Sequence, residues 1–215
     1  MKKRKNKFYH VSPMNSGKRK NKKRNFFIKN YSESWNYVKD SRNFIYSIIL
    51  VFLAFFLIGF FLPVPKDIAE QILKFIEELL KQTENMNQSE ITRFIFLNNL
   101  QSSFTGMLFG IFLGIFPLIV AMLNGYILGF VVLLSVGSEG FLVLWKLLPH
   151  GVFELPAVFI SLGLGLRFGT FIFQKNKTES FRNYLWNSLK TFLFIVFPLL
   201  VVAAIIEGSL IILTG

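Results

Sequence analysis

The run FIYSIILVFLAFFLIGFFL, from Phe44 to Leu62, decides the class of this protein. It holds no charged residue, and its length of about 19 residues suits a helix that crosses a hydrocarbon core roughly 30 Å thick. Pro63 and Pro65 follow directly and end the predicted helix, because proline disrupts a helix interior. Across the chain, 53% of the 215 residues are hydrophobic, more than a soluble domain usually carries. We therefore predict an all-α, polytopic protein of the cell membrane.

Further apolar segments bring the prediction to about five spans. Asn124-Gly125 favours a tight turn, so the chain is expected to reverse there at the cytoplasmic surface. After Tyr126, Gly137 to Gly140 either breaks the next span or separates residues 141–148 as a short re-entrant or interfacial piece. Five spans with the N-terminus in the cytoplasm place the C-terminus outside. The other spans are predicted at Asn98–Leu123, Val152–Phe173 and Thr191–Leu213, the last with a kink at Pro198.

Residues 1–43 form a strongly basic arm. They carry 14 basic and 2 acidic side chains, a surplus equal to the net charge of +12 of the whole chain. Lys and Arg next to a span favour the cytoplasmic side and attract anionic lipid headgroups, so we expect both from this arm. We expect it to be partly disordered, up to about Asn25, because it has little apolar surface to bury. Nucleic-acid binding is not expected, since basic charge alone reads no sequence. Residues 44–215 are assigned to the membrane domain.

Residues 66–82 are predicted to form an amphipathic helix outside the cell. Apolar residues recur there at helical spacing and charged residues occupy the other face. Asp67 and Glu70 resemble a capping box at its start. Such a helix either lies flat on the outer leaflet or docks on a partner. Two favourable pairs stand four residues apart, Glu70 with Lys74 and Glu77 with Lys81.

Two stripes of small residues recur at every fourth position. Small side chains let membrane helices approach closely, where packing drives association because lipid offers no hydrophobic force. We predict that the two stripes pack face to face; a stripe left unused within the monomer would be available to a homo-oligomer. The first stripe is Ser102, Gly106, Gly110 and Gly114, and the second is Ala157, Ser161, Gly165 and Gly169.

The stretch from Pro149 to Ala157 places two titratable side chains and two prolines within an otherwise apolar sequence. His150 and Glu154 stand four residues apart, so a helix would place both side chains on one face. Pro149 suits the first position of such a helix, and Pro156 would then fall in its second turn. The candidate functional motif is Pro149, His150, Gly151, Glu154 and Pro156.

Several other polar residues are predicted to share the outer half of the membrane with this motif. Because polar side chains are costly at membrane depth, they should face inward and hydrogen-bond one another. The cluster either locks the helices in register or forms an outward-facing site in which Glu154 holds His150. The chain has no Cys and only two His, so we expect no metal, no cofactor and no catalytic residues. The supporting residues are Asn98, Asn99, Glu139 and Glu207, with Asn124 and Gly125 at the predicted turn.

These elements resemble the family of stage II sporulation protein M. The resemblance rests on Asn98-Asn99-Leu100, the glycine stripe, Asn124-Gly125, and above all Pro149-His150-Gly151 followed by Phe153-Glu154-Leu155-Pro156-Ala157. It covers about Phe44 to Leu213. In spore-forming bacteria it implies an integral membrane protein that acts with a lytic transglycosylase and an amidase-endopeptidase in septal wall remodelling. Similar proteins also occur in organisms that form no spores, where the role is unassigned.

Three hypotheses about function follow. The first is a non-enzymatic membrane scaffold that positions extracytoplasmic partners such as cell-wall remodelling enzymes, because the soluble segments are too short to hold a hydrolase domain. The second is a transporter of a small solute or lipid that uses the outer polar cluster. The third is an intramembrane enzyme with His150 as acid or base and Glu154 as its orienting partner.

Overall fold

The computed structural model describes residues 16–140 and 144–214, and nearly all of them are helical. The predicted all-α class is therefore confirmed. The elements are α1 (Ser16–Asp40), α2 (Arg42–Phe61), α3 (Lys66–Thr83), α4 (Gln88–Leu108), the 3₁₀ turn η1 (Phe109–Ile111), α5 (Ile115–Glu139), α6 (Leu144–Gly169), the 3₁₀ turn η3 (Thr170–Phe173), α7 (Lys177–Thr191), the π-helical η4 (Phe192–Val196) and α8 (Phe197–Thr214).

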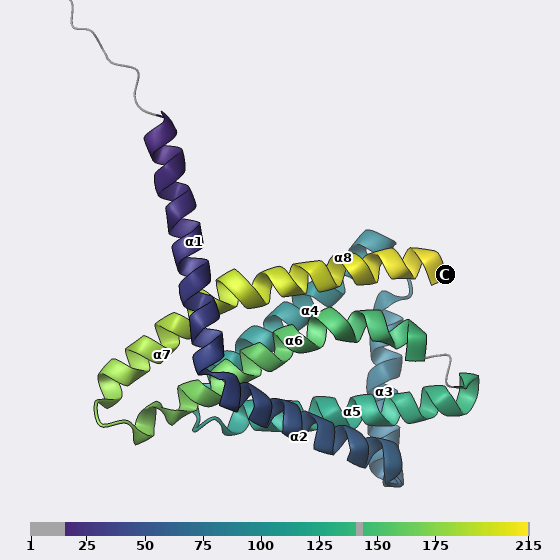
Figure 1. Cartoon of the computed structure of the whole chain (residues 1–215). Coiled ribbons are helices and arrows are strands. Elements are labelled where there is room, and N and C mark those ends of the chain that lie inside the picture. The colour runs from purple at the N-terminus through teal and green to yellow at the C-terminus, as the bar shows by residue number, and fades with distance from the viewer. Residues whose placement is uncertain (1–15, 141–143, 215) are drawn as a thin grey trace, which may run out of the picture.

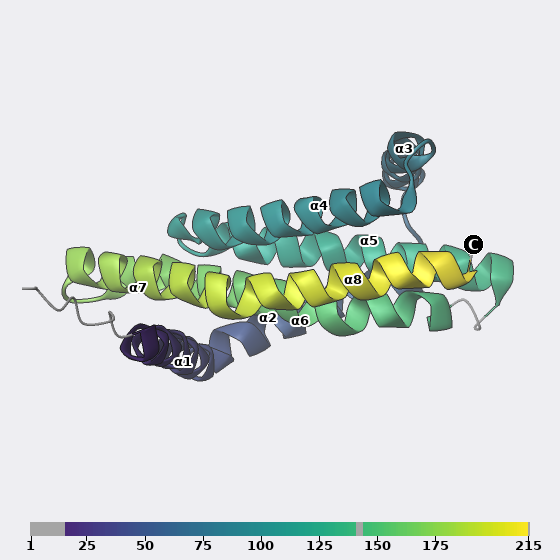
Figure 2. The same cartoon turned by 90° about the horizontal axis from the view of Figure 1, so that it is seen from above.

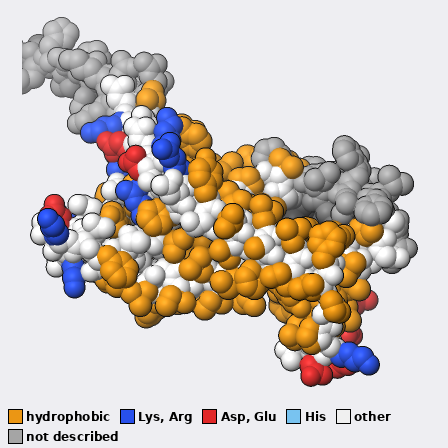
Figure 3. All heavy atoms as spheres, turned by 60° about the horizontal axis from the view of Figure 1, so that its bottom comes forward, with side chains coloured by type: hydrophobic (Ala, Val, Ile, Leu, Met, Phe, Trp, Pro, Cys, Tyr) orange, Lys and Arg blue, Asp and Glu red, His pale blue; other side chains and the backbone are white. Residues whose placement is uncertain are grey.

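The long helices form a bundle with a crossing helix near each end. α2, α4, α5, α6 and the α7–α8 pair lie lengthwise beside one another, whereas α1 and α3 run across this direction (Figures 1 and 2). On the face shown in Figure 3, hydrophobic side chains cover the middle of the bundle and charged side chains gather towards its ends. This distribution is the one expected of a protein whose middle lies in hydrocarbon and whose ends lie in water.

Within residues 16–140 and 144–214, four helical segments are long and apolar enough to cross a membrane. They are Arg42–Phe61, Ile115–Gly137, Glu154–Phe173 and Lys177–Ile206. α4 lies along the same direction but is not among them, because polar residues such as Asn98, Asn99 and Gln101 occupy its middle. The predicted number of about five spans includes the segment that α4 occupies.

The turn predicted at Asn124-Gly125 is wrong, because α5 runs through both residues without interruption. The chain reverses earlier, where α4 gives way to η1 and the backbone takes positive φ angles of 59° at Leu113 and 73° at Gly114. Glycine adopts such angles without strain, which suits Gly114 to this position. Gly125 serves a different purpose: a Cβ atom there would collide with the carbonyl oxygen of Phe52 on α2.

Two other boundaries differ from the prediction. α6 begins at Leu144, so Pro149 lies inside the helix rather than at its first position, and residues 144–148 are not a separate segment. α1 begins at Ser16, within the arm that is expected to be partly disordered up to about Asn25. The last predicted span is preceded by α7, which continues through η4 into α8. The π-helical turn precedes Pro198, whose missing N–H cannot bond the carbonyl of Phe194.

α2 and α5 form a tightly packed parallel pair. Added Cβ atoms at Gly59, Gly125 and Gly129 would strike the carbonyl oxygens of Tyr126, Phe52 and Phe56, respectively. These positions advance together along both helices, so the two helices run in the same direction. Near the α1 end the pair packs on α6 through buried side chains, of which Ile48, Ala121 and Leu162 are almost fully enclosed.

α4 with η1 and α6 form a second parallel pair, in which the two small-residue stripes face each other. Ser161 Oγ donates a hydrogen bond of 2.7 Å to the carbonyl oxygen of Ser103. A Cβ atom at Gly165 would lie 2.9 Å from Cα of Met107, and one at Gly169 would collide with the backbone of Gly114. α8 completes this half of the bundle, packing Leu200 and its neighbours against Met107 and Ala157.

We expect Gly129→Ala to destabilise the protein by about 1–3 kcal/mol, since the added methyl group must push α2 away from α5. The measurement is the free energy of unfolding in an SDS titration of mixed micelles. Gly137→Ala on the same helix is the matched control, because nothing lies within 4 Å of the added Cβ. The control should gain about 0.5–1 kcal/mol from better helix propensity. Equal effects of the two substitutions would show that the α2–α5 contact does not hold the fold.

Candidate polar cavity

A cavity of about 920 Å³ lies between α2, α5, α4 and α6. α2 and α5 supply mostly aromatic and branched aliphatic side chains, including Phe56, Phe60 and Val131. α4 and α6 supply most of the polar ones. The polar lining residues are Asn98, Asn99 and Ser102 from α4, Asn124 from α5 and Glu154 from α6.

The cavity opens where the two tight helix pairs separate. On α2 its lining runs from Phe52 to Phe61, which is the half of the helix that leads towards α3. Beyond Phe52, towards the α1 end, buried apolar side chains fill the space between the pairs. The rings of Phe52 and Phe159 pack edge to face there, with their centres 5.0 Å apart. The cavity is therefore closed towards the α1 end and confined to the half of the bundle that leads to α3.

The structure brings together only part of the predicted polar set. Asn98, Asn99, Asn124, Gly151 and Glu154 all line the cavity. Gly125 and Pro156 do not: Gly125 packs against α2, and Pro156 is exposed. The side chains of Glu139, Pro149, His150 and Glu207 lie outside the described residues, so the predicted contact between His150 and Glu154 does as well.

The polar side chains face the cavity rather than one another. Within residues 16–140 and 144–214, the side chains of Asn98, Asn99, Ser102 and Asn124 form no hydrogen bond. The asparagines therefore take no part in the hydrogen bonding predicted within the polar set, whose members Glu139, His150 and Glu207 have side chains outside the described residues. Asn98, Ser102 and Asn124 are exposed, and one carboxylate oxygen of Glu154, Oε2, is buried. The arrangement offers several amide, hydroxyl and carboxylate groups to a molecule inside the cavity.

An internal correspondence underlies this site, and the sequence analysis missed it. The Gly59 contact with Tyr126 and the Gly129 contact with Phe56 are reciprocal, so α2 and α5 use equivalent positions. In the other pair, Asn99 precedes the first stripe by three residues, as Glu154 precedes the second stripe. The α2–α4 half and the α5–α6 half thus repeat one pattern. The sequence offered one signal of this repeat: Gly125 and Gly129 of α5 stand four residues apart, as the small residues of the two stripes do.

A second polar site joins α1 to the bundle through Arg167 of α6. Its Nη1 atom donates 2.8 Å and 3.4 Å hydrogen bonds to Ser41 Oγ and the Tyr37 carbonyl oxygen, and its guanidinium carbon lies 4.3 Å from the centre of the Tyr37 ring. Because α1 ends at Asp40, this positive charge lies at the negative end of the helix dipole. Burial raises the pKa of the Tyr37 hydroxyl, which stays protonated at neutral pH.

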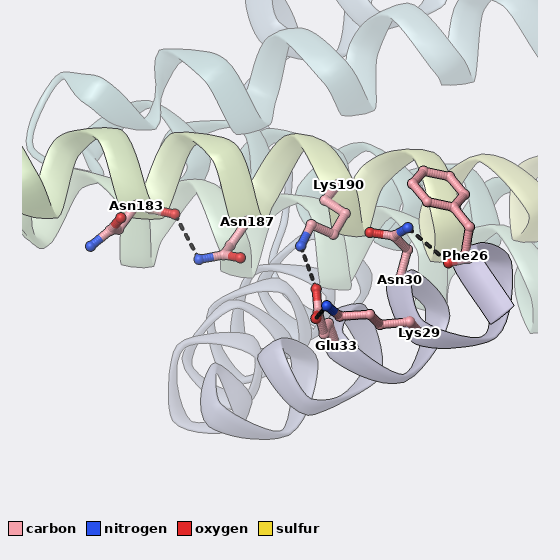
Figure 4. A network of polar contacts seen from close by, with 7 residues as sticks. All are labelled: Phe26, Lys29, Asn30, Glu33, Asn183, Asn187 and Lys190. Atoms are coloured by element: carbon pink, nitrogen blue, oxygen red, sulfur yellow. Dashed lines mark hydrogen bonds and ion pairs between the residues drawn. The ribbon is translucent and has the colours of Figure 1, made fainter. Parts of the chain in front are cut away.

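An ion pair makes a second attachment of α1, to α7 (Figure 4). Lys190 Nζ donates a hydrogen bond of 2.7 Å to one carboxylate oxygen of Glu33, and Lys29 Nζ lies 3.8 Å from the other. The hydrogen bond from Lys190 lowers the pKa of the Glu33 carboxyl below its ordinary value. Phe27 and Phe194 add an edge contact with ring centres 6.2 Å apart.

The apolar bundle, its small-residue helix contacts and its charged ends define a multi-pass helical membrane protein. Within that class the chain belongs to the stage II sporulation protein M family, whose sequence model matches residues 48–210. The resemblance found in the motifs is therefore confirmed. The match contains every residue that lines the cavity, whereas α1 precedes it.

A relative in Methanocaldococcus jannaschii, the uncharacterized protein MJ0706, is 35% identical over 173 residues. The alignment covers 78% of this chain and 77% of that protein. No solved structure matches the chain. Family membership thus rests on sequence, and the cavity described above is a feature of this structure.

We expect α1 to loosen from the bundle when the pH falls well below 4.5, the ordinary pKa of a glutamate. The Glu33 pKa is lower in the folded protein than in the unfolded chain, so the ion pair stabilises docking above this range and loses its effect as Glu33 is protonated. Amide hydrogen exchange over residues 29–40, corrected for intrinsic pH effects, should become faster.

Glu33→Gln provides the control for this pH effect. Its exchange over residues 29–40 should already be faster at pH 6 and should change little on acidification. Identical protection of the wild type at pH 6 and pH 3.5 would contradict the assignment of Glu33 to the attachment of α1.

Proposed function

We propose that the protein is a membrane scaffold that holds extracytoplasmic partners, such as cell-wall remodelling enzymes, at the outer surface of the membrane. The observation that carries this proposal is the position of α3. It crosses the end of the bundle opposite α1 and presents exposed apolar side chains beside charged ones. The proposal assigns no catalytic step and no cofactor to this chain.

The proposed topology has five spans, with the N-terminus in the cytoplasm and the C-terminus outside. α1 and α3 cross opposite ends of the bundle, which supports their assignment to opposite surfaces (Figure 1). Residues 63–93, which include α3, carry 4 basic and 6 acidic side chains, opposite in sign to the basic arm. Excess Lys and Arg favour the cytoplasmic side, which supports placing α1 there and α3 outside.

α3 has the surface properties of a docking helix. Ile72 is buried, but Ile68, Leu73 and Phe75 are 42%, 48% and 50% exposed. The rest of the chain therefore leaves much of the apolar surface of α3 exposed. Glu77 and Lys81 form a 2.6 Å ion pair on the charged face. The predicted capping box at Asp67 is absent, since α3 begins after Pro65; a capping box is present instead at the start of α4, between Asn87 and Glu90.

α1 is proposed to bind the anionic inner surface of the membrane. It runs across the long direction of the bundle (Figure 1), as an interfacial helix does, and carries exposed aromatic residues beside its Lys and Arg residues. Aromatic side chains favour the boundary of the hydrocarbon, and basic side chains attract anionic headgroups. The exposed apolar residues are Phe26, Phe27, Ile28, Tyr31 and Trp35.

The cavity favours a second candidate function, the handling of a small solute or lipid. Transport requires a route to both surfaces, and in this structure the apolar layer around Ile48, Ala121 and Leu162 closes the route towards α1. Binding is therefore better supported than passage. Intramembrane catalysis is supported by no comparable observation, and among the described residues no three of His, Cys, Asp and Glu gather as a metal site would need.

We expect p-benzoylphenylalanine at position 75, which is 50% exposed on α3, to crosslink a protein partner in native membranes. The matched control is position 50 on α2, where Leu50 is 72% exposed on a membrane-spanning segment and should give lipid adducts only. Distinct protein bands from position 75 alone are the expected result. Lipid adducts without protein bands at both positions would refute the scaffold.

We expect the arm to retain anionic lipids during purification of the full-length protein. Replacing Lys20, Lys22 and Lys23 by Gln should release most of them, because each basic residue near an anionic surface contributes about 1 kcal/mol. Native mass spectrometry counts the lipids bound to each variant. Replacing Lys66, Lys74 and Lys81 of α3 by Gln is the control and should leave the count unchanged. Equal loss from both variants would contradict a specific role for α1.

A further inference from the structure

We propose that the outer face of α4 is a homodimer interface within the membrane, in which the carboxamide of Gln101 pairs with the same group of a second copy of this chain. The inference goes beyond the scaffold role and makes no use of the cavity. It rests on the proposed five-span topology, in which α4 is one of the spans.

Gln101 lies at hydrocarbon depth. It stands two residues before Ser103, whose carbonyl oxygen accepts the 2.7 Å hydrogen bond from Ser161 of α6. Ser161 falls near the middle of the apolar segment Glu154–Phe173. A helix rises by about 1.5 Å per residue, so Gln101 is displaced from Ser103 by about 3 Å along the helix axis. The polar side chain therefore lies well inside a layer roughly 30 Å thick.

Gln101 faces away from the rest of the bundle. Successive residues of a helix are rotated by about 100°, so Gln101 projects on nearly the opposite side from Ser103, which is buried against α6. Gln101 is exposed and does not line the cavity, although the adjacent Ser102 does. It forms no hydrogen bond with any other residue that the structure describes. α4 packs on α6 and α8, and its other side stands at the edge of the bundle (Figure 2).

An exposed glutamine at this depth is unfavourable in lipid. The carboxamide carries both donors and an acceptor, and hydrocarbon offers them no partner. Elsewhere in the middle of the bundle exposed side chains are large and apolar, as at Leu53, Leu123 and Leu193. The four segments that are apolar enough to cross a membrane also leave out α4. The outer face of α4 is therefore better suited to contact with protein than with lipid.

The residues around Gln101 form a face suited to helix packing. Phe94, Leu97, Gln101 and Thr105 recur at spacings of three and four residues, so they lie on one side of α4. Leu97 is 46% exposed, and Phe94 and Thr105 are half-buried. None of these four side chains is charged, so the face offers no ionic contact to a partner. Two such faces would bury apolar side chains around one polar contact.

A second copy of the chain is the partner that this face fits. A twofold axis brings a residue of one copy close to the same residue of the other. Because a carboxamide both donates and accepts, two Gln101 side chains can form two hydrogen bonds with each other. The two small-residue stripes are already used inside the monomer, between α4 with η1 and α6. The outer face of α4 thus remains for association of two copies.

Cysteine crosslinking tests the contact directly, because the chain has no Cys of its own. The full-length protein carries Gln101→Cys, and native membranes that contain it are oxidised mildly. We expect a disulfide-linked dimer, since the symmetry places the two thiols together. Ser102→Cys, at the adjacent position that lines the cavity, is the matched control and should stay monomeric. Leu53→Cys, at a 51% exposed position on α2, reports random collisions.

Substitutions of Gln101 test the hydrogen bonds. Energy transfer between labelled copies in liposomes gives the dissociation constant of the dimer. Gln101→Leu should raise this constant by about fivefold or more, since each interhelical hydrogen bond in a membrane contributes about threefold and two are lost. Gln101→Asn keeps a carboxamide and should restore part of the affinity. Thermal unfolding of the monomer in detergent should change little, because Gln101 bonds to no described residue of its own chain.

Four outcomes would overturn the inference. The absence of energy transfer at every protein density, or equal linkage of Gln101→Cys and Ser102→Cys, would show that no dimer forms at this face. An unchanged dissociation constant for Gln101→Leu would remove the carboxamide from the contact. Linkage to a different protein without dimers would show that the partner is not a second copy.

The proposed topology can be tested separately from the dimer. Rapid reaction of Gln101→Cys with a membrane-impermeant maleimide in sealed vesicles would place this face of α4 in water. That result would overturn the five-span topology together with the dimer. Failure of the dimer without such a reaction leaves the topology, and the crosslinking expected at position 75 of α3, in place.

Discussion

The close approach of helix backbones at small residues is the contact on which the rest of the structure depends. Apolar side chains gain little by leaving lipid for protein, so helices in a membrane associate through packing and hydrogen bonds. Gly59, Gly125 and Gly129 join α2 to α5, and the two stripes join α4 with η1 to α6. Both pairs are parallel, and in both the helices meet at small residues that stand four positions apart. The bundle is thus two similar tight pairs, with α8 packed on the second.

The same constraint produces the cavity. The pairs meet closely near the α1 end, where Ile45 approaches Gly163 and Leu162 is almost fully buried. Towards α3 the facing positions carry large or polar side chains, such as Phe56, Asn99 and Glu154, and the pairs separate around a space of about 920 Å³. Polar residues at this depth are costly unless something bonds to them. Asn98, Asn99 and Asn124 line this space without hydrogen bonds among themselves, which is why the binding of a small solute or lipid is kept as the second candidate function.

Much of the fold could be predicted from the sequence. A long apolar run is compatible with few structures besides a membrane-spanning helix, and a repeat of small residues marks a face on which two such helices pack closely. The turn at Asn124-Gly125 could not, since the local preference of that dipeptide gives way to a tertiary contact in which Gly125 admits the backbone of α2. That error also placed Asn124 at the cytoplasmic surface instead of in the cavity. The cost of polar burial grouped Asn98, Asn99 and Glu154, and all three line the cavity. The cavity itself depends on the divergence of two helix pairs, which no local pattern encodes.

α1 shows how an extension can be fixed to a family fold. It precedes residues 48–210, the part that matches the family, yet both of its polar attachments reach residues inside that part, Arg167 and Lys190. Arg167 lies late in α6, whose packing against α4 is set by the stripes, so the anchor for α1 is positioned by the same contacts that shape the cavity. At the opposite end α3 crosses the bundle on the side towards which the cavity lies. A ligand that changed the spacing of the pairs would therefore act on the end of the bundle that carries α3, while the layer around Ile48 and Leu162 shields the attachment of α1.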